Sequence, residues 1–134
     1  MGLDRFLTAQ DGIYDRALQE LRAGRKTSHW MWFVFPQIAG LGRSLTAQHY
    51  AIRDLDEARD YLAHPVLGPR LAEASQALLD LATTDAAGVL GGIDAMKLRS
   101  SMTLFAHAGG DPVFRAVLDR FFGGEDDPET VRRL

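Results

Sequence analysis

The sequence predicts an all-α (mainly α) protein, a single compact domain of about seven to eight short helices. Three observations indicate this class: apolar residues recur at helical spacing, helix start and stop signals follow at short intervals, and period-two alternation is nearly absent. The 134 residues fit one helical domain over 1–134 and are too few for a second core. The short intervals between signals exclude a bundle of long helices.

The composition argues against two classes of binding partner, nucleic acids and membranes. Hydrophobic residues make up 46% and charged residues 25%, the balance of a globular protein. The net charge of -3 argues against nucleic-acid binding, which draws affinity from phosphate neutralisation, and against a polybasic membrane anchor. The longest apolar run, residues 30–36, is too short to cross a bilayer. We therefore expect neither a nucleic-acid nor a membrane partner.

The chain contains no cysteine. This excludes disulfides, zinc–thiolate sites, iron–sulfur ligation and thiol nucleophiles. Cysteine-free composition fits a reducing compartment, and the first residues lack the pattern of a signal peptide, so we expect a cytoplasmic protein.

The first half of the chain predicts three helices after a short turn at residues 5–9. Each begins at a side chain that can accept hydrogen bonds from free N–H groups at a helix start. These N-caps are Asp11, Ser44, and either Asp54 or Asp56. The helices end at Gly24, at Tyr50 and at His64–Pro65, where the residue before proline avoids helical geometry.

The second half contains the clearest helix. Its apolar residues follow steps of four, three, four and three, which form one buried seam: Leu67, Leu71, Ala74, Leu78 and Leu81. A short segment from residues 84–85 to Gly91–Gly92 precedes a helix that Asp94 caps and that runs to about His107. Asp111–Pro112 begins a helix with a broad apolar face, and Asp127–Pro128 begins a final turn.

The aromatic run at residues 30–35 is the one stretch whose composition permits a buried strand. A short apolar run is equally typical of a buried helix. Because the sequence offers no partner strand, helix or irregular structure is favoured.

Four segments resemble the signature of a bacterial family, domain of unknown function 1810. They are Ser28–Gln37 with Gly40–Ser44, Tyr61–Gly68, Asp94 with Lys97–Phe105, and Val117–Gly124. The resemblance runs in order over nearly the whole chain and implies a mainly helical fold and no known activity. Members are sometimes labelled calpastatin-like. That label does not fit, because such inhibitors are disordered repeats and this chain has neither property.

The aromatic run is also the first candidate site. Trp30 and Trp32 can form walls for a flat ligand, while His29 and Gln37 bracket the run with hydrogen-bonding groups. The alternative is that these aromatic residues form the centre of the core, and both interpretations can hold for different side chains.

The turn Gly40–Ser44 is the second candidate. Backbone N–H groups at a helix start, together with Arg43 and Ser44, can hold an anion or phosphate. The spacing matches neither a Walker loop nor a dinucleotide fingerprint, so a capped loop with a solvated arginine is the alternative.

The helix from Asp94 supplies the third candidate. Lys97, Arg99 and Ser100 can contact an anionic group, whereas a solvated polar face is the alternative. Ser100, Thr103 and His107 share one face, but spacing establishes no nucleophile and base, and the catalytic residues stay unassigned. The histidines lack ligand spacing, so neither a metal nor a cofactor is expected.

Two functions follow as hypotheses. The first is binding of an anionic, partly aromatic, nucleotide-like small molecule, with hydrolysis of a glycosidic bond as its enzymatic version. The second is a non-catalytic interaction module, including a homodimer through the apolar helix Val113–Phe122. A structural protein without a ligand is the third alternative.

Overall fold

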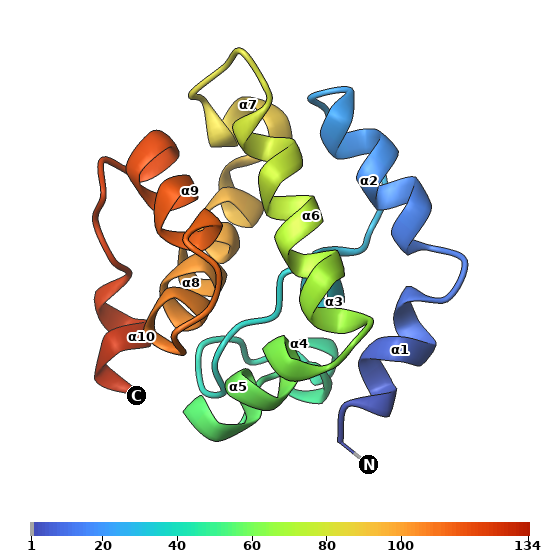
Figure 1. Cartoon of the computed structure of the whole chain (residues 1–134), viewed down its shortest axis with the longest axis vertical. Coiled ribbons are helices and arrows are strands. Elements are labelled where there is room, and N and C mark those ends of the chain that lie inside the picture. The colour runs from blue at the N-terminus through green and yellow to red at the C-terminus, as the bar shows by residue number, and fades with distance from the viewer. Residues whose placement is uncertain (1) are drawn as a thin grey trace.

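The computed structural model describes residues 2–134 and confirms the mainly α fold (Figure 1). Among these residues there are ten helices and no strand, only an isolated bridge between Ile38 and Ile52. The helices are α1 Asp4–Gln10, α2 Tyr14–Arg22, α3 Met31–Val34, α4 Leu45–His49, α5 Leu55–Ala63, α6 Leu67–Leu79, α7 Ala86–Leu90, α8 Gly92–His107, α9 Val113–Phe122 and α10 Pro128–Arg132.

The core lies where α6, α8 and α9 pack against one another (Figure 1). The predicted seam of α6 is buried at Leu67, Leu71, Ala74 and Leu78, while Leu81 lies just beyond the helix and is half-buried. Helix α8 is buried on more than one side. Its apolar residues Leu98, Met102 and Phe105 are fully enclosed, as predicted.

Three predicted N-caps are confirmed and three are wrong, one of them Asp111, because α9 begins at Val113 after Pro112 and has no side-chain cap. Ser44, Asp54 and Asp127 accept hydrogen bonds from backbone N–H groups three residues later. Asp11 instead follows α1, and α2 begins at Tyr14 without a side-chain cap. Asp94 lies inside the first turn of α8, because this helix begins at Gly92, and its carboxylate pairs with two lysines, Lys26 and Lys97.

The aromatic run forms one helical turn, α3, followed by extended chain. The extended part is held to a distant segment by two backbone hydrogen bonds of 2.8 Å. Ala39 N–H donates to the Ile52 carbonyl, and Ile52 N–H donates to the Gln37 carbonyl. These bonds fix the position of Gln37.

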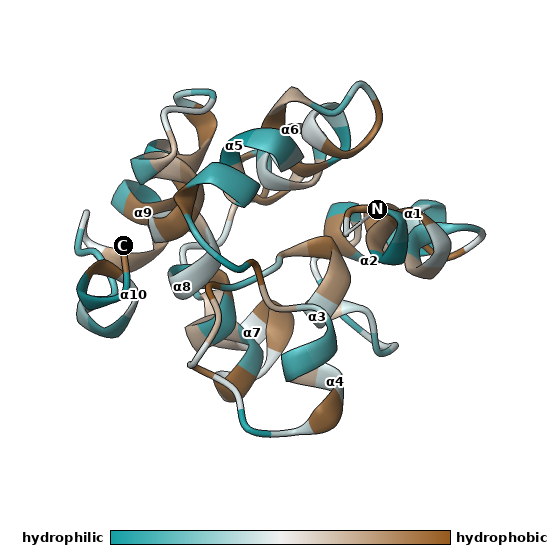
Figure 2. Ribbon diagram, turned by 90° about the horizontal axis from the view of Figure 1, so that it is seen from below, coloured by the Kyte–Doolittle hydropathy of each residue, from teal (hydrophilic) through white to brown (hydrophobic). Residues whose placement is uncertain are grey.

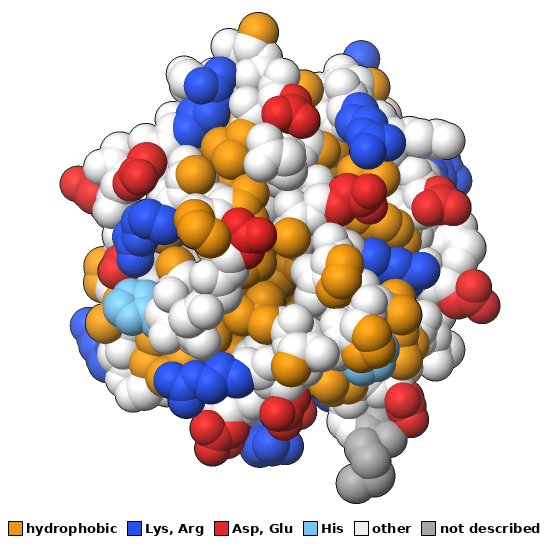
Figure 3. All heavy atoms as spheres, viewed as in Figure 1, with side chains coloured by type: hydrophobic (Ala, Val, Ile, Leu, Met, Phe, Trp, Pro, Cys, Tyr) orange, Lys and Arg blue, Asp and Glu red, His pale blue; other side chains and the backbone are white. Residues whose placement is uncertain are grey.

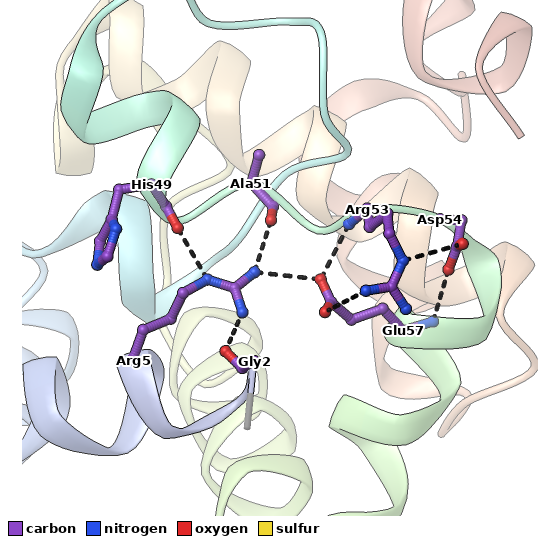
Figure 4. A network of polar contacts seen from close by, with 7 residues as sticks. All are labelled: Gly2, Arg5, His49, Ala51, Arg53, Asp54 and Glu57. Atoms are coloured by element: carbon purple, nitrogen blue, oxygen red, sulfur yellow. Dashed lines mark hydrogen bonds and ion pairs between the residues drawn. The ribbon is translucent and has the colours of Figure 1, made fainter.

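A mostly buried arginine joins α1 to the segment at residues 49–57 (Figure 4). The Arg5 guanidinium donates to the carbonyls of Gly2, His49 and Ala51 and pairs with the buried Glu57 carboxylate at 3.1 Å. This network positions the chain that connects α4 to α5.

The predicted dimerisation helix, α9, uses its apolar face within the molecule. Val113, Phe114, Val117 and Leu118 are buried in the core. Phe121 and Phe122 remain half-buried, so little apolar surface is left for a partner, and the homodimer through this helix stays a prediction.

No helix among the described residues is long and apolar enough to cross a membrane.

Candidate functional site

A cavity of about 500 Å³, here called the large cavity, opens between the loop before α4, the start of α8 and α10. In Figure 2, α3 and α4 lie on the same side as α7, which leads directly into α8. The cavity brings together six of the nine residues that the sequence predicts for a ligand site: Trp32, Gln37, Arg43, Ser44, Lys97 and Ser100. Their role in binding stays a prediction.

Trp32 and Lys97 form the centre of the large cavity. The Lys97 ammonium lies 4.7 Å from the centroid of the Trp32 ring, a cation–π contact. The same ammonium lies 3.4 Å from Asp94, whose other oxygen binds Lys26 at 2.9 Å. One carboxylate thus serves two lysines, of which Lys97 lines the large cavity and Lys26 does not.

Trp30 lies elsewhere, in the core. Its indole N–H donates to the buried Glu20 carboxylate at 2.9 Å. That carboxylate also accepts from the backbone of Thr27 and from Ser28, through both backbone and hydroxyl. Burial alone would raise the pKa of Glu20, but these hydrogen bonds lower it to about 2. His29 is exposed and does not line the large cavity.

Arg43 and Ser44 form the rim beside α4. The Ser44 hydroxyl accepts from Ala47 N–H at 3.0 Å, and the Gln48 amide donates to the Arg43 carbonyl at 2.9 Å. Both bonds fix the backbone of this turn. The Arg43 guanidinium is exposed and has no hydrogen bond or ion pair with any residue in 2–134.

The polar face of α8 holds the C-terminal segment against the helix. The Ser100 hydroxyl donates to Asp127 at 3.0 Å, and the Thr103 hydroxyl accepts from Asp127 N–H at 3.0 Å. His107 contacts Asp126, and Arg99 donates to the carbonyls of residues 125 and 126. The shared face was predicted correctly, and it contacts the C-terminal segment, with Ser100 and Thr103 buried and His107 exposed. Arg99 does not line the large cavity.

Asp126 is the charged centre of this attachment. It lies 3.0 Å from His107 and 2.8 Å from Arg115. Burial alone would raise the pKa of Asp126, but the hydrogen bonds from His107 and Arg115 hold it below its usual range. The segment that carries α10 is therefore fixed by polar contacts as well as packing.

The C-terminal segment contributes two carboxylates to the lining of the large cavity, Asp127 and Glu129. Neither was identified as a site residue from the sequence. The Asp127 carboxylate accepts hydrogen bonds from Ser100 and Thr130, and the Glu129 carboxylate forms ion pairs with Arg132 and Arg133. Ile93 and Met96 were missed as well. Together with Lys97 and Ser100 they follow the spacing i, i+3, i+4 and i+7, so a common face was readable from the sequence.

A second cavity of about 120 Å³, the small cavity, adjoins the first. The two share the lining residues Trp32, Gln37, Gly42 and Ala47. Tyr50 and Ala51, on the segment that Arg5 holds, line only the small cavity. The two cavities therefore lie side by side and share a wall.

Another hollow, of about 570 Å³, lies between α5, the start of α6 and the start of α9. Apolar side chains gather near the centre of the face in Figure 3, with most charges around them. Arg59 and Asp111 are the charged groups of this hollow. It thus lacks the cation–hydroxyl set of the large cavity. Within residues 2–134, no three His, Asp or Glu side chains could hold a metal ion.

Comparison with known proteins identifies a family and a solved structure, and the description of neither states an activity. Residues 1–134 match the family described as "Protein of unknown function (DUF1810)". The fold is similar to the crystal structure of the conserved hypothetical protein Rv1873 from Mycobacterium tuberculosis, with a TM-score of 0.96 and 47% sequence identity. The match covers 98% of this chain and 95% of that one. No curated protein matches this chain.

Proposed function

This chain belongs to the DUF1810 family, and we propose that it binds a small, anionic, partly aromatic molecule of nucleotide-like chemistry in the large cavity. One observation carries the proposal. The fold gathers an aromatic face, two cations and a hydroxyl from segments far apart in the sequence: Trp32, Arg43, Lys97 and Ser100.

The charges favour an anionic ligand. Arg43 has no partner among the described residues, and its planar guanidinium suits bidentate binding of phosphate or carboxylate. Lys97 shares its counter-ion with Lys26. Of the two carboxylates in the large cavity, Asp127 accepts hydrogen bonds from Thr130 and Glu129 pairs with Arg132 and Arg133, so neither pairs with Arg43.

The dimensions also suit a small molecule. A volume of about 500 Å³ lies within the range of roughly 300–1,000 Å³ of ligand pockets. The half-buried Trp32 ring, together with Ile93 and Met96, supplies apolar surface beside the charges. Such a mixture fits a ligand with a ring at one end and an anion at the other.

The proposal stops at binding. Hydrolysis of a glycosidic bond usually requires a carboxyl group that can act as an acid or a nucleophile. Asp127 and Glu129 are the carboxylates that line the large cavity, and each is engaged in the attachment or capping of α10. Product analysis after incubation with each ligand that binds tests for turnover.

A thermal-shift screen tests the proposal, with nucleotides, nucleotide sugars and phosphorylated metabolites as ligands. At a hundredfold excess over Kd, a ligand adds about 2.7 kcal/mol to the free energy of unfolding. For a chain of this size we expect Tm to rise by roughly 10 °C. Arg43→Gln should lose the shift, whereas Arg25→Gln, at another exposed arginine without a described partner, should keep it.

Two outcomes of the screen would contradict the proposal. One is the absence of any shift across the panel. The other is a shift that Arg43→Gln retains in full, because the anion would then bind elsewhere.

A second candidate is self-association through the rim of the large cavity. Leu45, Ile93 and Met96 are the three most exposed large apolar side chains of the described residues, at 84%, 75% and 72%. Ile93 and Met96 line the large cavity, and Leu45 follows its rim residue Ser44. Such clustering is typical of interaction surfaces. Sedimentation at rising concentration should show a dimer that Met96→Gln weakens, and a monomer throughout would exclude this candidate.

A further inference from the structure

The small cavity adjoins the proposed anion site, and nothing described so far assigns it an occupant. We propose that it is the ring subsite of the same ligand, that it admits one six-membered ring of pyrimidine size, and that it excludes a fused bicyclic ring such as a purine. This inference rests on the proposed function, because it places the anionic end of the same molecule at Arg43.

The volume sets the size limit. An apolar cavity of about 150 Å³ holds one benzene molecule. The small cavity measures about 120 Å³, which is less than this volume, so a single ring fills it and two fused rings exceed it.

The walls of the small cavity at Ile38 and Gly42 are held in place by backbone contacts. Ile38 is buried, and the backbone on both sides of it is held to Ile52 by two hydrogen bonds of 2.8 Å. On the opposite side Gly42 touches Ala47 so closely that a Cβ on Gly42 would lie 2.4 Å from the Ala47 Cβ. Enlarging the small cavity at Ile38 or at Gly42 would therefore require movement of the backbone.

The lining suits a planar, polar ring. Trp32 and Tyr50 both line the small cavity, and the Tyr50 ring is fixed by Phe33 at a centroid distance of 5.4 Å. The Gln37 side-chain amide also lines it and has no hydrogen bond with any described residue. An amide carries both a donor and an acceptor, so Gln37 matches a ring with an adjacent N–H and carbonyl.

The path between the two ends is short and continuous. Gly42 lines both cavities, and the next residue, Arg43, lines only the large one. The Gln48 amide, at the small cavity, holds the Arg43 carbonyl at 2.9 Å. A ring in the small cavity thus extends its substituent toward the Arg43 guanidinium, as in a pyrimidine nucleotide.

Isothermal titration calorimetry with three probes tests this inference: uridine 5′-monophosphate, adenosine 5′-monophosphate and ribose 5-phosphate. Wild-type protein should bind the uridine nucleotide at least about tenfold more tightly than either other probe, a difference worth one good hydrogen bond. Gln37→Met, of similar size, should lower that affinity to the level of ribose 5-phosphate. Arg25→Gln, at a residue outside both cavities, should leave the affinity for all three probes unchanged.

The other outcomes separate this inference from the proposed function. Equal affinity for the uridine and adenosine nucleotides would overturn the ring-size limit and leave the anion site standing. Equal affinity for the uridine nucleotide and ribose 5-phosphate would overturn the ring subsite. Failure of all three probes, together with a silent thermal-shift screen, would overturn the proposed function itself.

Discussion

Glu20 supports the aromatic segment, and its ionisation should make the stability of the protein depend on acid pH. The carboxylate is buried and lies against four donor groups from residues 27–30. Its pKa falls from an ordinary 4.5 to about 2 in the folded protein. Because the folded pKa is depressed, the stabilisation is complete above about pH 5 and is lost as the pH falls toward 2.

The size of the effect follows from the two pKa values. A shift of about 2.5 pH units corresponds to about 3 kcal/mol of unfolding free energy at neutral pH. By the same relation, about 1.4 kcal/mol remains at pH 3. Glu20→Gln should remove this contribution with little change in geometry. Its carbonyl can still accept from the three N–H groups that Oε1 now binds, and its amide can donate to Ser28.

Urea denaturation of wild-type protein and Glu20→Gln, followed by tryptophan fluorescence from pH 7 to pH 3, measures this effect. The difference in unfolding free energy between the two proteins should shrink by about 2 kcal/mol across that range. Titration of the other carboxyl groups is common to both proteins and cancels in the difference. A difference that stays constant with pH would refute the reasoning.

Two other predictions concern stability and use the same denaturation measurement. Gly68→Ala should lower the free energy of unfolding by about 1–3 kcal/mol, because its Cβ would lie 2.1 Å from the Leu62 carbonyl oxygen. Gly92→Ala has open space around the new Cβ and should raise the free energy of unfolding by about 0.4–1 kcal/mol. Equal effects of the two substitutions would contradict this prediction. Arg5→Ala should lower the free energy of unfolding by about 3 kcal/mol, because it removes the more buried of the two arginines that pair with Glu57 and the donors to three backbone carbonyls. The exposed Arg59→Ala should lower it by under about 0.5 kcal/mol. A small loss in Arg5→Ala would show that the network in Figure 4 is not stabilising.

Local sequence patterns predicted much of the fold. Two kinds of pattern depend only on neighbouring residues. One is the spacing of apolar residues by four and three along α6, and the other is the pair of N-caps, Ser44 and Asp127. The predicted cap Asp94 was wrong because α8 begins two residues earlier, at Gly92, and its carboxylate instead pairs with Lys26, far away in the sequence. A sequence shows that a side chain can cap a helix, but not which distant partner the fold brings to it.

The candidate site was predicted in part for the same reason. Trp30 and Trp32 look alike in the sequence, and only the position of Glu20 determines that Trp30 enters the core. The face of Ser100 and Thr103 follows from helical geometry, but its partner, the segment before α10, lies more than 20 residues away. Contacts between distant segments therefore set the limit of the sequence analysis.

The two tryptophans allow the most direct test of the proposed site. Each contributes one indole N–H resonance to a ¹H–¹⁵N correlation spectrum. Trp32 lines both cavities, whereas the Trp30 N–H is buried against Glu20. During titration with uridine 5′-monophosphate the Trp32 resonance should move in a saturable manner while the Trp30 resonance stays in place. A Trp32 resonance that does not move, or a shift confined to Trp30, would contradict a ligand site in these cavities.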